Sequence, residues 1–162
     1  EQTAPGTVII TETNVPHKDN ISYFGNGTDE AQMVYQFPLP PLVIYTLMYG
    51  DSSVISNWAK GLDTPTDEVT YFNFLASHDG IGINPIRGIV PEEKILAMVG
   101  TLEKNGALVS NKKNPDGSLS PYEVNSSYIN AVSKKSDSEE TKIRKFLNAQ
   151  SILLSFKRVP TN

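Results

Sequence analysis

The sequence predicts an α/β protein built on a parallel sheet. Three short apolar runs, each bounded by turn residues, alternate with segments that carry helix start and stop signals. This alternation is typical of successive βαβ units. The chain has 162 residues, 38% hydrophobic and 20% charged, which suits one domain with a buried core. A complete eight-stranded α/β barrel needs about 250 residues, so the chain is too short to form one by itself.

The first predicted strand lies close to the start of the chain. The β-branched run over 7–12 (TVIITE) lies between turn residues, which predicts a strand buried on both faces. The polar segment over 14–29 is long for a structureless connection, and loops of this length usually carry a function. We therefore expect a functional loop after the first strand.

Two further strands, with helices between them, complete the predicted sheet. A short strand is expected over 32–37, followed by a helix over 41–49 that begins at a proline. A second helix is expected over 52–60, with a serine as its N-cap and a glycine after its last residue. The run over 68–76 (EVTYFNFLA) is rich in β-branched and aromatic residues and predicts the third strand.

The second half of the chain has a different pattern. A helix is expected over 91–104, because Pro-Glu-Glu opens it and Asn-Gly follows it. Short strands and turns are expected over 106–133, with a strong turn signal at 114–117 (NPDG). A last helix is expected over 138–158, because Ser-Glu-Glu begins an apolar face. The region between the two helices therefore reads as a small insert.

Composition excludes several classes of function. The 14 Lys and Arg against 18 Asp and Glu give a formal charge of −4, and the only basic pairs are isolated, so we expect no nucleic-acid partner. The absence of cysteine excludes a disulfide scaffold and thiolate chemistry. The longest apolar stretch, over 37–49, is shorter than the ~20 residues of a membrane helix, so we expect no membrane partner.

Acidic residues follow two of the predicted strands. Glu12 ends the first strand, and Asp79 follows the third, next to His78. Functional residues of parallel α/β sheets collect at the carboxyl ends of strands. Two carboxylates at one rim are the minimum for glycosidic bond chemistry. Such acids at strand ends are more often helix caps or surface charges than catalytic groups, and no metal-binding cluster is visible.

Five segments carry a resemblance to a known family. They are ITETNVPHKDNISYFG, DEAQMVYQFPLPPLVIYTLMYG, YFNFLASHDGIG, NPDGSLSPYEVNSSYINA and FLNAQSILLSFKRVP. Together they resemble the sucrose phosphorylase branch of the α-amylase superfamily, in the same order and over nearly the whole chain. The wording TETNVPH and SPYE is most similar to the glucosylglycerate phosphorylase type.

The resemblance implies a partial (β/α)8 TIM barrel. Strands five to seven and their helices would occupy 1–81, a small inserted subdomain with the acceptor loop 82–137, and barrel helix seven 138–162. The chain would then be a fragment of a longer enzyme. The family's nucleophile, an Asp at the end of strand four two residues after an Arg, would lie in a part of the enzyme that this chain does not contain.

The resemblance also implies roles for individual residues. Glu12 matches the general acid/base, Asp79 the carboxylate that stabilises the transition state, and His78 a sugar-binding histidine. This chain has Asn14 where sucrose phosphorylases usually have His, and Glu123 where they usually have Gln. These two differences favour a glucoside other than sucrose. The residues expected to line the substrate site are Asn14, His17, Tyr122, Glu123 and Asn125. For His17, an exposed loop histidine without a role in binding is at least as good an interpretation.

The implied function is a retaining glycoside phosphorylase. It would cleave an α-glucoside (glucosylglycerate, sucrose or sucrose phosphate) with inorganic phosphate to α-glucose 1-phosphate, with no cofactor and no metal. We expect a cytoplasmic enzyme, because phosphate is plentiful there and the product is retained. The alternatives are an α-glucosidase or transglycosidase of the same superfamily, or an inactive sugar-binding fragment. Without the nucleophile, the isolated chain is expected to be inactive.

Overall fold

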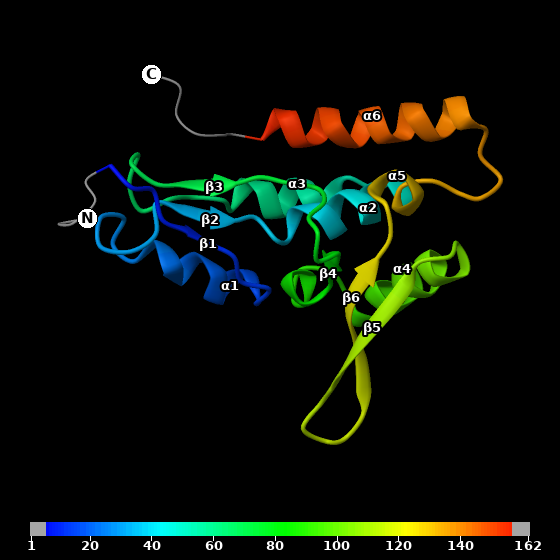
Figure 1. Cartoon of the computed structure of the whole chain (residues 1–162), viewed down its shortest axis with the longest axis horizontal. Coiled ribbons are helices and arrows are strands. Elements are labelled where there is room, and N and C mark those ends of the chain that lie inside the picture. The colour runs from blue at the N-terminus through cyan, green and yellow to red at the C-terminus, as the bar shows by residue number, and fades with distance from the viewer. Residues whose placement is uncertain (1–5, 157–162) are drawn as a thin grey trace.

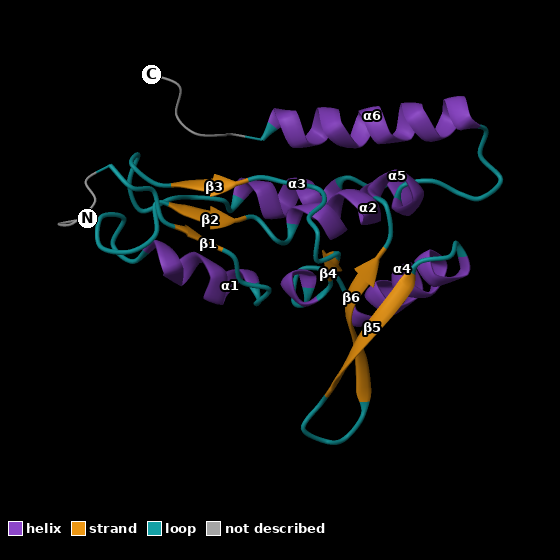
Figure 2. Cartoon of the chain, in the orientation of Figure 1, coloured by secondary structure: helices purple, strands orange, loops and turns teal. Residues whose placement is uncertain are grey.

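The computed structural model describes residues 6–156, which form two small sheets with helices around them (Figure 2). The first sheet is parallel and has the spatial order β1-β2-β3, with the strands β1 (Ile10–Thr11), β2 (Met33–Tyr35) and β3 (Thr70–Phe72). The prediction of an α/β protein with a parallel sheet is confirmed. The described residues form no closed barrel.

The prediction for the first strand is wrong in its length and its burial. β1 has two residues, and the side chains before its end are exposed: Val8 by 55%, Ile9 by 47% and Ile10 by 45%. The reason is its position, because β1 pairs only with β2 and lies at the edge of the sheet (Figure 1). An apolar run indicates a buried strand, but burial also needs neighbours that cover it.

The segment over 14–29 contains two helical turns, so the expectation of a long loop is wrong. They are the helix α1 (His17–Asn20) and the 3-10 helix η1 (Ile21–Phe24). Phe24 is 1% exposed and packs edge-on against Tyr71, with ring centroids 5.1 Å apart. A buried aromatic anchor of this kind ties the segment to one face of the sheet.

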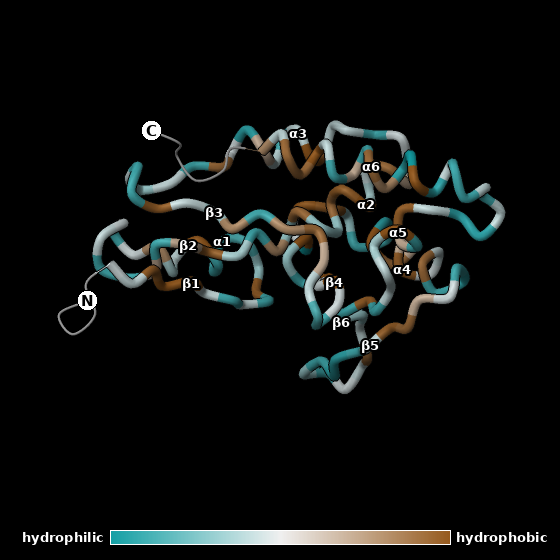
Figure 3. Tube along the Cα trace, turned by 45° about the horizontal axis from the view of Figure 1, so that its top comes forward, coloured by the Kyte–Doolittle hydropathy of each residue, from teal (hydrophilic) through white to brown (hydrophobic). Residues whose placement is uncertain are grey.

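Two helices link β2 to β3. The helix α2 (Leu39–Tyr49) begins two residues earlier than expected and ends at Gly50, whose φ of +66° suits a glycine C-cap. The helix α3 (Ser53–Lys60) agrees with its prediction. Figure 3 shows the apolar stretch of α2 in brown in the middle of the molecule. The most deeply buried core side chains are Leu39, Leu42, Val43, Ile44, Ile83, Ile86, Ile95, Met98, Leu102 and Val124.

The region after β3 forms the second sheet, which is antiparallel. Its spatial order is β4-β6-β5, with the strands β4 (Ile81–Gly82), β5 (Leu108–Lys113) and β6 (Leu119–Asn125). The predicted turn joins β5 to β6, since the N–H of Asn114 donates to the carbonyl of Ser118 at 2.8 Å. The predicted short strands over 106–133 are confirmed, and Figure 1 shows their hairpin extending away from the other elements.

The remaining helices cover the core. A 3-10 turn η2 (Asn84–Ile86) and the helix α4 (Glu92–Lys104) follow β4, and a short helix α5 (Tyr128–Ala131) follows β6. The helix α6 (Glu139–Ser155) packs against α2 and α5 and begins at its predicted cap, where Ser138 accepts a hydrogen bond from the N–H of Thr141. The last two residues of the expected helix, 157–158, lie outside the described residues. Among the described helices, none has the length and apolar character to cross a membrane.

Candidate active site at the strand ends

Glu12 lies at the carboxyl end of β1, next to the central strand. Thr11 pairs with Val34 in the parallel register, so the following residue, Glu12, lies beside Tyr35. Residues at matching positions of a parallel pair point to the same face of the sheet. Glu12 and Tyr35 therefore project from one face, and the side chain of Glu12 is exposed there.

Tyr35 is surrounded by aromatic rings on this face. Its ring centroid lies 4.8 Å from that of Phe72, 5.1 Å from Phe74 and 5.6 Å from Phe37. Burial raises the pKa of the Tyr35 phenol, and the negative charges of Glu12 and Asp79 raise it further. The carboxylates of Glu12 and Asp79, which follow different strands, thus both act on the Tyr35 phenol.

His78 and Asp79 form an exposed pair after β3. His78 Nε2 lies 3.2 Å from Asp79 Oδ1, and the side chains are 83% and 57% exposed. The N–H of Asp79 donates to the hydroxyl of Ser77 at 3.3 Å, which fixes the local backbone. The pair is therefore open to a ligand that approaches the strand ends.

Two asparagine side chains lie directly on glycine backbone at the start of the second sheet. A Cβ atom at Gly82 would lie 2.7 Å from Oδ1 of Asn14, and one at Gly80 would lie 2.6 Å from Oδ1 of Asn125. Gly80 also has a φ of +106°, which side chains other than glycine rarely adopt. The two glycines thus allow Asn14 and Asn125 to approach the segment that carries Asp79.

Glu123 lies on the same side as these asparagines. It pairs with Gly82 across β4 and β6. Burial raises the pKa of the Glu123 carboxyl, and the charge of Asp79 raises it further. A second-sheet carboxyl therefore joins the group formed by Glu12 and Asp79.

One of the expected substrate residues, His17, packs away from the acids. The ring of His17 lies 6.0 Å from Trp58 and 6.3 Å from Tyr71, and burial lowers the pKa of His17. Tyr71 alternates with Phe72 along β3, so His17 packs on the opposite face of the sheet. Tyr122 lies at an irregularity of β6, because Ser110 pairs with Glu123 and Asn111 pairs with Pro121. The regular alternation of side chains is interrupted there.

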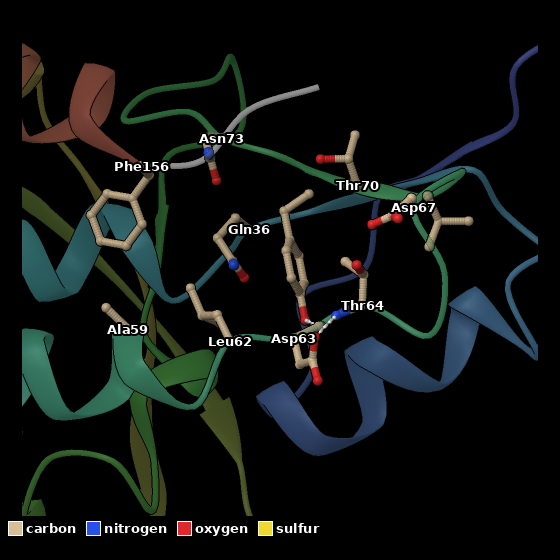
Figure 4. Close-up of a pocket in the computed structure, with 11 residues that line it drawn as sticks. Gln36, Ala59, Leu62, Asp63, Thr64, Asp67, Thr70, Asn73 and Phe156 are labelled. Carbon is tan, nitrogen blue, oxygen red and sulfur yellow. Dashed lines mark hydrogen bonds between the residues drawn. The ribbon is translucent and has the colours of Figure 1, made fainter. Parts of the chain in front are cut away.

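The face of the parallel sheet on which His17 packs also has a cavity of about 170 Å³, at the free edge of β3 (Figure 4). Gln36 and Tyr71 line it, and these residues alternate with Tyr35 and Phe72 along their strands. Both polar atoms of the Gln36 side chain are buried and have no hydrogen-bond partner among residues 6–156. The other lining residues are Ala59, Leu62, Asp63, Thr64, Asp67, Val69, Thr70, Asn73 and Phe156.

Tyr35 is the residue of this site that sequence reasoning did not single out. It belongs to a strand rich in aromatic residues, where a core role is the ordinary interpretation. Its place in the strand could have indicated this role. Side chains alternate along a strand, so Tyr35 shares a face of β2 with Met33, and Tyr35 lies at the carboxyl end of β2. The described residues hold no group of three His, Cys, Asp or Glu side chains that could bind a metal ion.

The sequence of this chain is similar to those of several known phosphorylases. No family model matches it. A glucosylglycerate phosphorylase of Escherichia coli is 56% identical over 160 residues, which are 99% of this chain and 29% of the relative. Nearly the whole chain is homologous to one segment of glucosylglycerate phosphorylase. A sucrose phosphorylase of Bifidobacterium adolescentis is 28% identical over 145 residues, 78% of this chain and 26% of that relative. The resemblance to the sucrose phosphorylase branch is confirmed.

A solved structure shares the fold. The sucrose 6F-phosphate phosphorylase from Thermoanaerobacter thermosaccharolyticum matches with a TM-score of 0.75 and 21% identity, over 96% of this chain and 29% of the solved chain. At this identity the match shows the fold alone. The chain thus spans 29% of the length of the glucosylglycerate phosphorylase it matches and an equal share of this solved phosphorylase.

Proposed function

We propose that this chain is part of a retaining glycoside phosphorylase that cleaves an α-glucoside with inorganic phosphate to α-glucose 1-phosphate. The identity of 56% with a glucosylglycerate phosphorylase over 99% of the chain carries the proposal. A second relative of that name is 50% identical, whereas the sucrose phosphorylase is 28% identical. Glucosylglycerate is therefore the preferred donor in this proposal, ahead of sucrose and sucrose phosphate.

The fold supports a place for the chain in a (β/α)8 barrel. In this proposal the residues 1–81 supply strands five to seven, 82–137 form the inserted subdomain with the acceptor loop, and 138–162 supply helix seven. The parallel order β1-β2-β3, with helices between the strands, fits this arrangement. The free edges of β1 and β3 would pair with strands four and eight of the parent enzyme.

The first half of the reaction uses both strand-end acids. A carboxylate of the parent enzyme attacks the anomeric carbon, and the bond from that carbon to the oxygen of the leaving glycerate breaks. Glu12 gives its proton to this oxygen, which leaves as the glycerate hydroxyl. Asp79 stabilises the positive charge that develops on the glucosyl ring, and His78 orients a sugar hydroxyl.

The second half of the reaction reverses these steps with phosphate. Glu12, now a carboxylate, takes a proton from phosphate, whose oxygen attacks the anomeric carbon and releases the enzyme carboxylate. The outcome is α-glucose 1-phosphate with its configuration retained. Asn14, Glu123 and Asn125, close to Asp79, are suited to contact the glucoside or the acceptor. Tyr122, next to Glu123 in β6, is a further candidate for the acceptor loop. His17, whose ring packs against Trp58 and Tyr71, would contact ligand only after a local rearrangement.

The test is an assay of the full-length enzyme. With phosphate and glucosylglycerate we expect release of α-glucose 1-phosphate, and with sucrose a much lower rate. Release of free glucose at a rate independent of phosphate would instead identify an α-glucosidase or transglycosidase. The 162-residue chain alone is expected to release no glucose 1-phosphate, because it lacks the proposed nucleophile. We place the parent enzyme in the cytoplasm, where phosphate is available and the charged product is retained.

A further inference from the structure

A fully buried asparagine links the ends of the first two strands. Asn20 is 0% exposed. Its Oδ1 accepts a hydrogen bond from the hydroxyl of Thr13 at 3.0 Å, and its Nδ2 donates to the carbonyl oxygen of Tyr35 at 2.8 Å. We call these three residues the Asn20 bridge. Both ends of the side-chain amide are therefore used, which is what a buried polar group requires.

The two partners of Asn20 flank the proposed acid/base. Thr13 directly follows Glu12 in the chain, and Tyr35 lies beside Glu12 on the neighbouring strand. The carboxylate of Glu12 itself makes no hydrogen bond to any described residue. Its direction therefore depends on the backbone of residues 11–13, and the Asn20 bridge holds that backbone to the end of β2.

The segment that carries Asn20 is itself fixed to the sheet. The N–H groups of Asp19 and Asn20 both donate to the carbonyl of Pro16, at 2.9 and 3.0 Å. Phe24, a few residues later, is buried against Tyr71. Asn20 therefore reaches Thr13 and Tyr35 from a short, anchored helical turn.

We propose that the Asn20 bridge positions Glu12 for its two proton transfers. The proposal rests on the proposed phosphorylase reaction. In that reaction Glu12 protonates the glycerate oxygen and later takes a proton from phosphate, and its carboxyl group keeps one position for both transfers. Displacements of about 1 Å can reduce a rate by about a hundredfold. Thr13 and Asn20 are thus positioning residues, which act through Glu12 and touch no substrate.

The first variant is Thr13→Val in the full-length enzyme. It keeps the shape of the side chain and removes the hydroxyl, so the buried Oδ1 of Asn20 loses its donor. We expect kcat to fall about tenfold while KM for the glucoside and for phosphate changes by less than about twofold. We also expect the pH profile of kcat/KM to change shape, because it reports the free enzyme's acid and base.

Three further variants separate positioning from folding. Thr13→Ser restores the hydroxyl and is expected to recover most of kcat. Asn20→Asp removes the donor to Tyr35 and is expected to lower kcat more than Thr13→Val does. Ser22→Ala is the matched control, since the hydroxyl of exposed Ser22, in the same segment, donates to the carbonyl of Asp19 and to no other described residue. Its kcat and pH profile are expected to equal those of the unmodified enzyme.

The outcomes distinguish this proposal from the proposed function. If the unmodified enzyme released only free glucose, phosphorolysis would be wrong, and the same comparison of hydrolysis rates would still test the Asn20 bridge. If Thr13→Val kept the kcat and the pH profile of the unmodified enzyme, the positioning role would be overturned. Equal losses of kcat in Thr13→Val, Thr13→Ser and Ser22→Ala would also overturn it, because they would indicate a general loss of folded enzyme.

Discussion

The outer edge of the parallel sheet and the packed side of the second sheet bury similar apolar residues to very different extents. Ile9, beside the edge strand β1, is 47% exposed, whereas Ile83, directly after β4, is 0% exposed. The second sheet packs on α2 and α4, which cover Ile81, Ile83 and Val124, whereas Leu108 and Leu119 at the ends of its hairpin strands are exposed. The parallel sheet ends at β1 and β3, whose outer edges have no described partner. Burial of a strand is thus decided by its neighbours as much as by its sequence.

The candidate site lies where these two regions meet. Glu12 and Tyr35 come from the parallel sheet, and Glu123 and Asn125 come from the second sheet. Asp79 lies on the segment that joins them. The parallel sheet, whose outer edges have no described partner, therefore contributes the proposed acid/base. The second sheet contributes residues suited to acceptor binding.

The largest expected effect comes from Glu12 itself. Glu12→Gln in the full-length enzyme removes the transferable proton, so we expect kcat with glucosylglycerate to fall at least about a hundredfold. The melting temperature is expected to stay unchanged, because the side chain is exposed. Glu30→Gln, an exposed change in the same half of the chain, is the control. A variant at Glu12 with unaltered kcat would remove this residue from the acid/base role.

The next effect measures the difference in burial between the two regions. In the 162-residue chain, Ile83→Ala is expected to lower the free energy of unfolding by about 2–5 kcal/mol, and Ile9→Ala by less than about 0.5 kcal/mol. Urea denaturation measures both values. In the full-length enzyme, where we propose that strand four covers β1, the cost of Ile9→Ala is expected to rise to about 2 kcal/mol. An unchanged small cost there would contradict the partial-barrel assignment.

The sequence predicted the elements better than it predicted their surroundings. Helices such as α6 carry their own start signal, and Ser138 caps it as expected. The strand over 7–12 was predicted to be buried because its pattern reports the faces that a strand prefers, not whether partners are present. The helical turns within 14–29 were missed because Pro16 and a buried Phe24, rather than apolar periodicity, produce them.

The site was predictable to a similar, limited degree. Glu12 and Asp79 could be named because acids at strand ends, together with a family resemblance, single them out. Their shared neighbour Tyr35 and the link through Asn20 depend on contacts between distant residues. Single-residue patterns do not contain that information. The contacts of the His17 ring with Trp58 and Tyr71 are likewise not visible in the sequence.

The smallest expected effect tests the seam between the two regions. Gly80 and Gly88 both have positive φ values, of +106° and +82°, but only at Gly80 would a Cβ atom meet a neighbour, Oδ1 of Asn125 at 2.6 Å. Alanine at either position is expected to cost about 1 kcal/mol of stability through backbone strain. Only Gly80→Ala also displaces Asn125, so we expect it alone to raise KM for the glucoside, severalfold, in the full-length enzyme. Equal KM values for Gly80→Ala and Gly88→Ala would show that the contact with Asn125 does not shape the substrate site, and that the second sheet supports the strand ends without contributing to binding there.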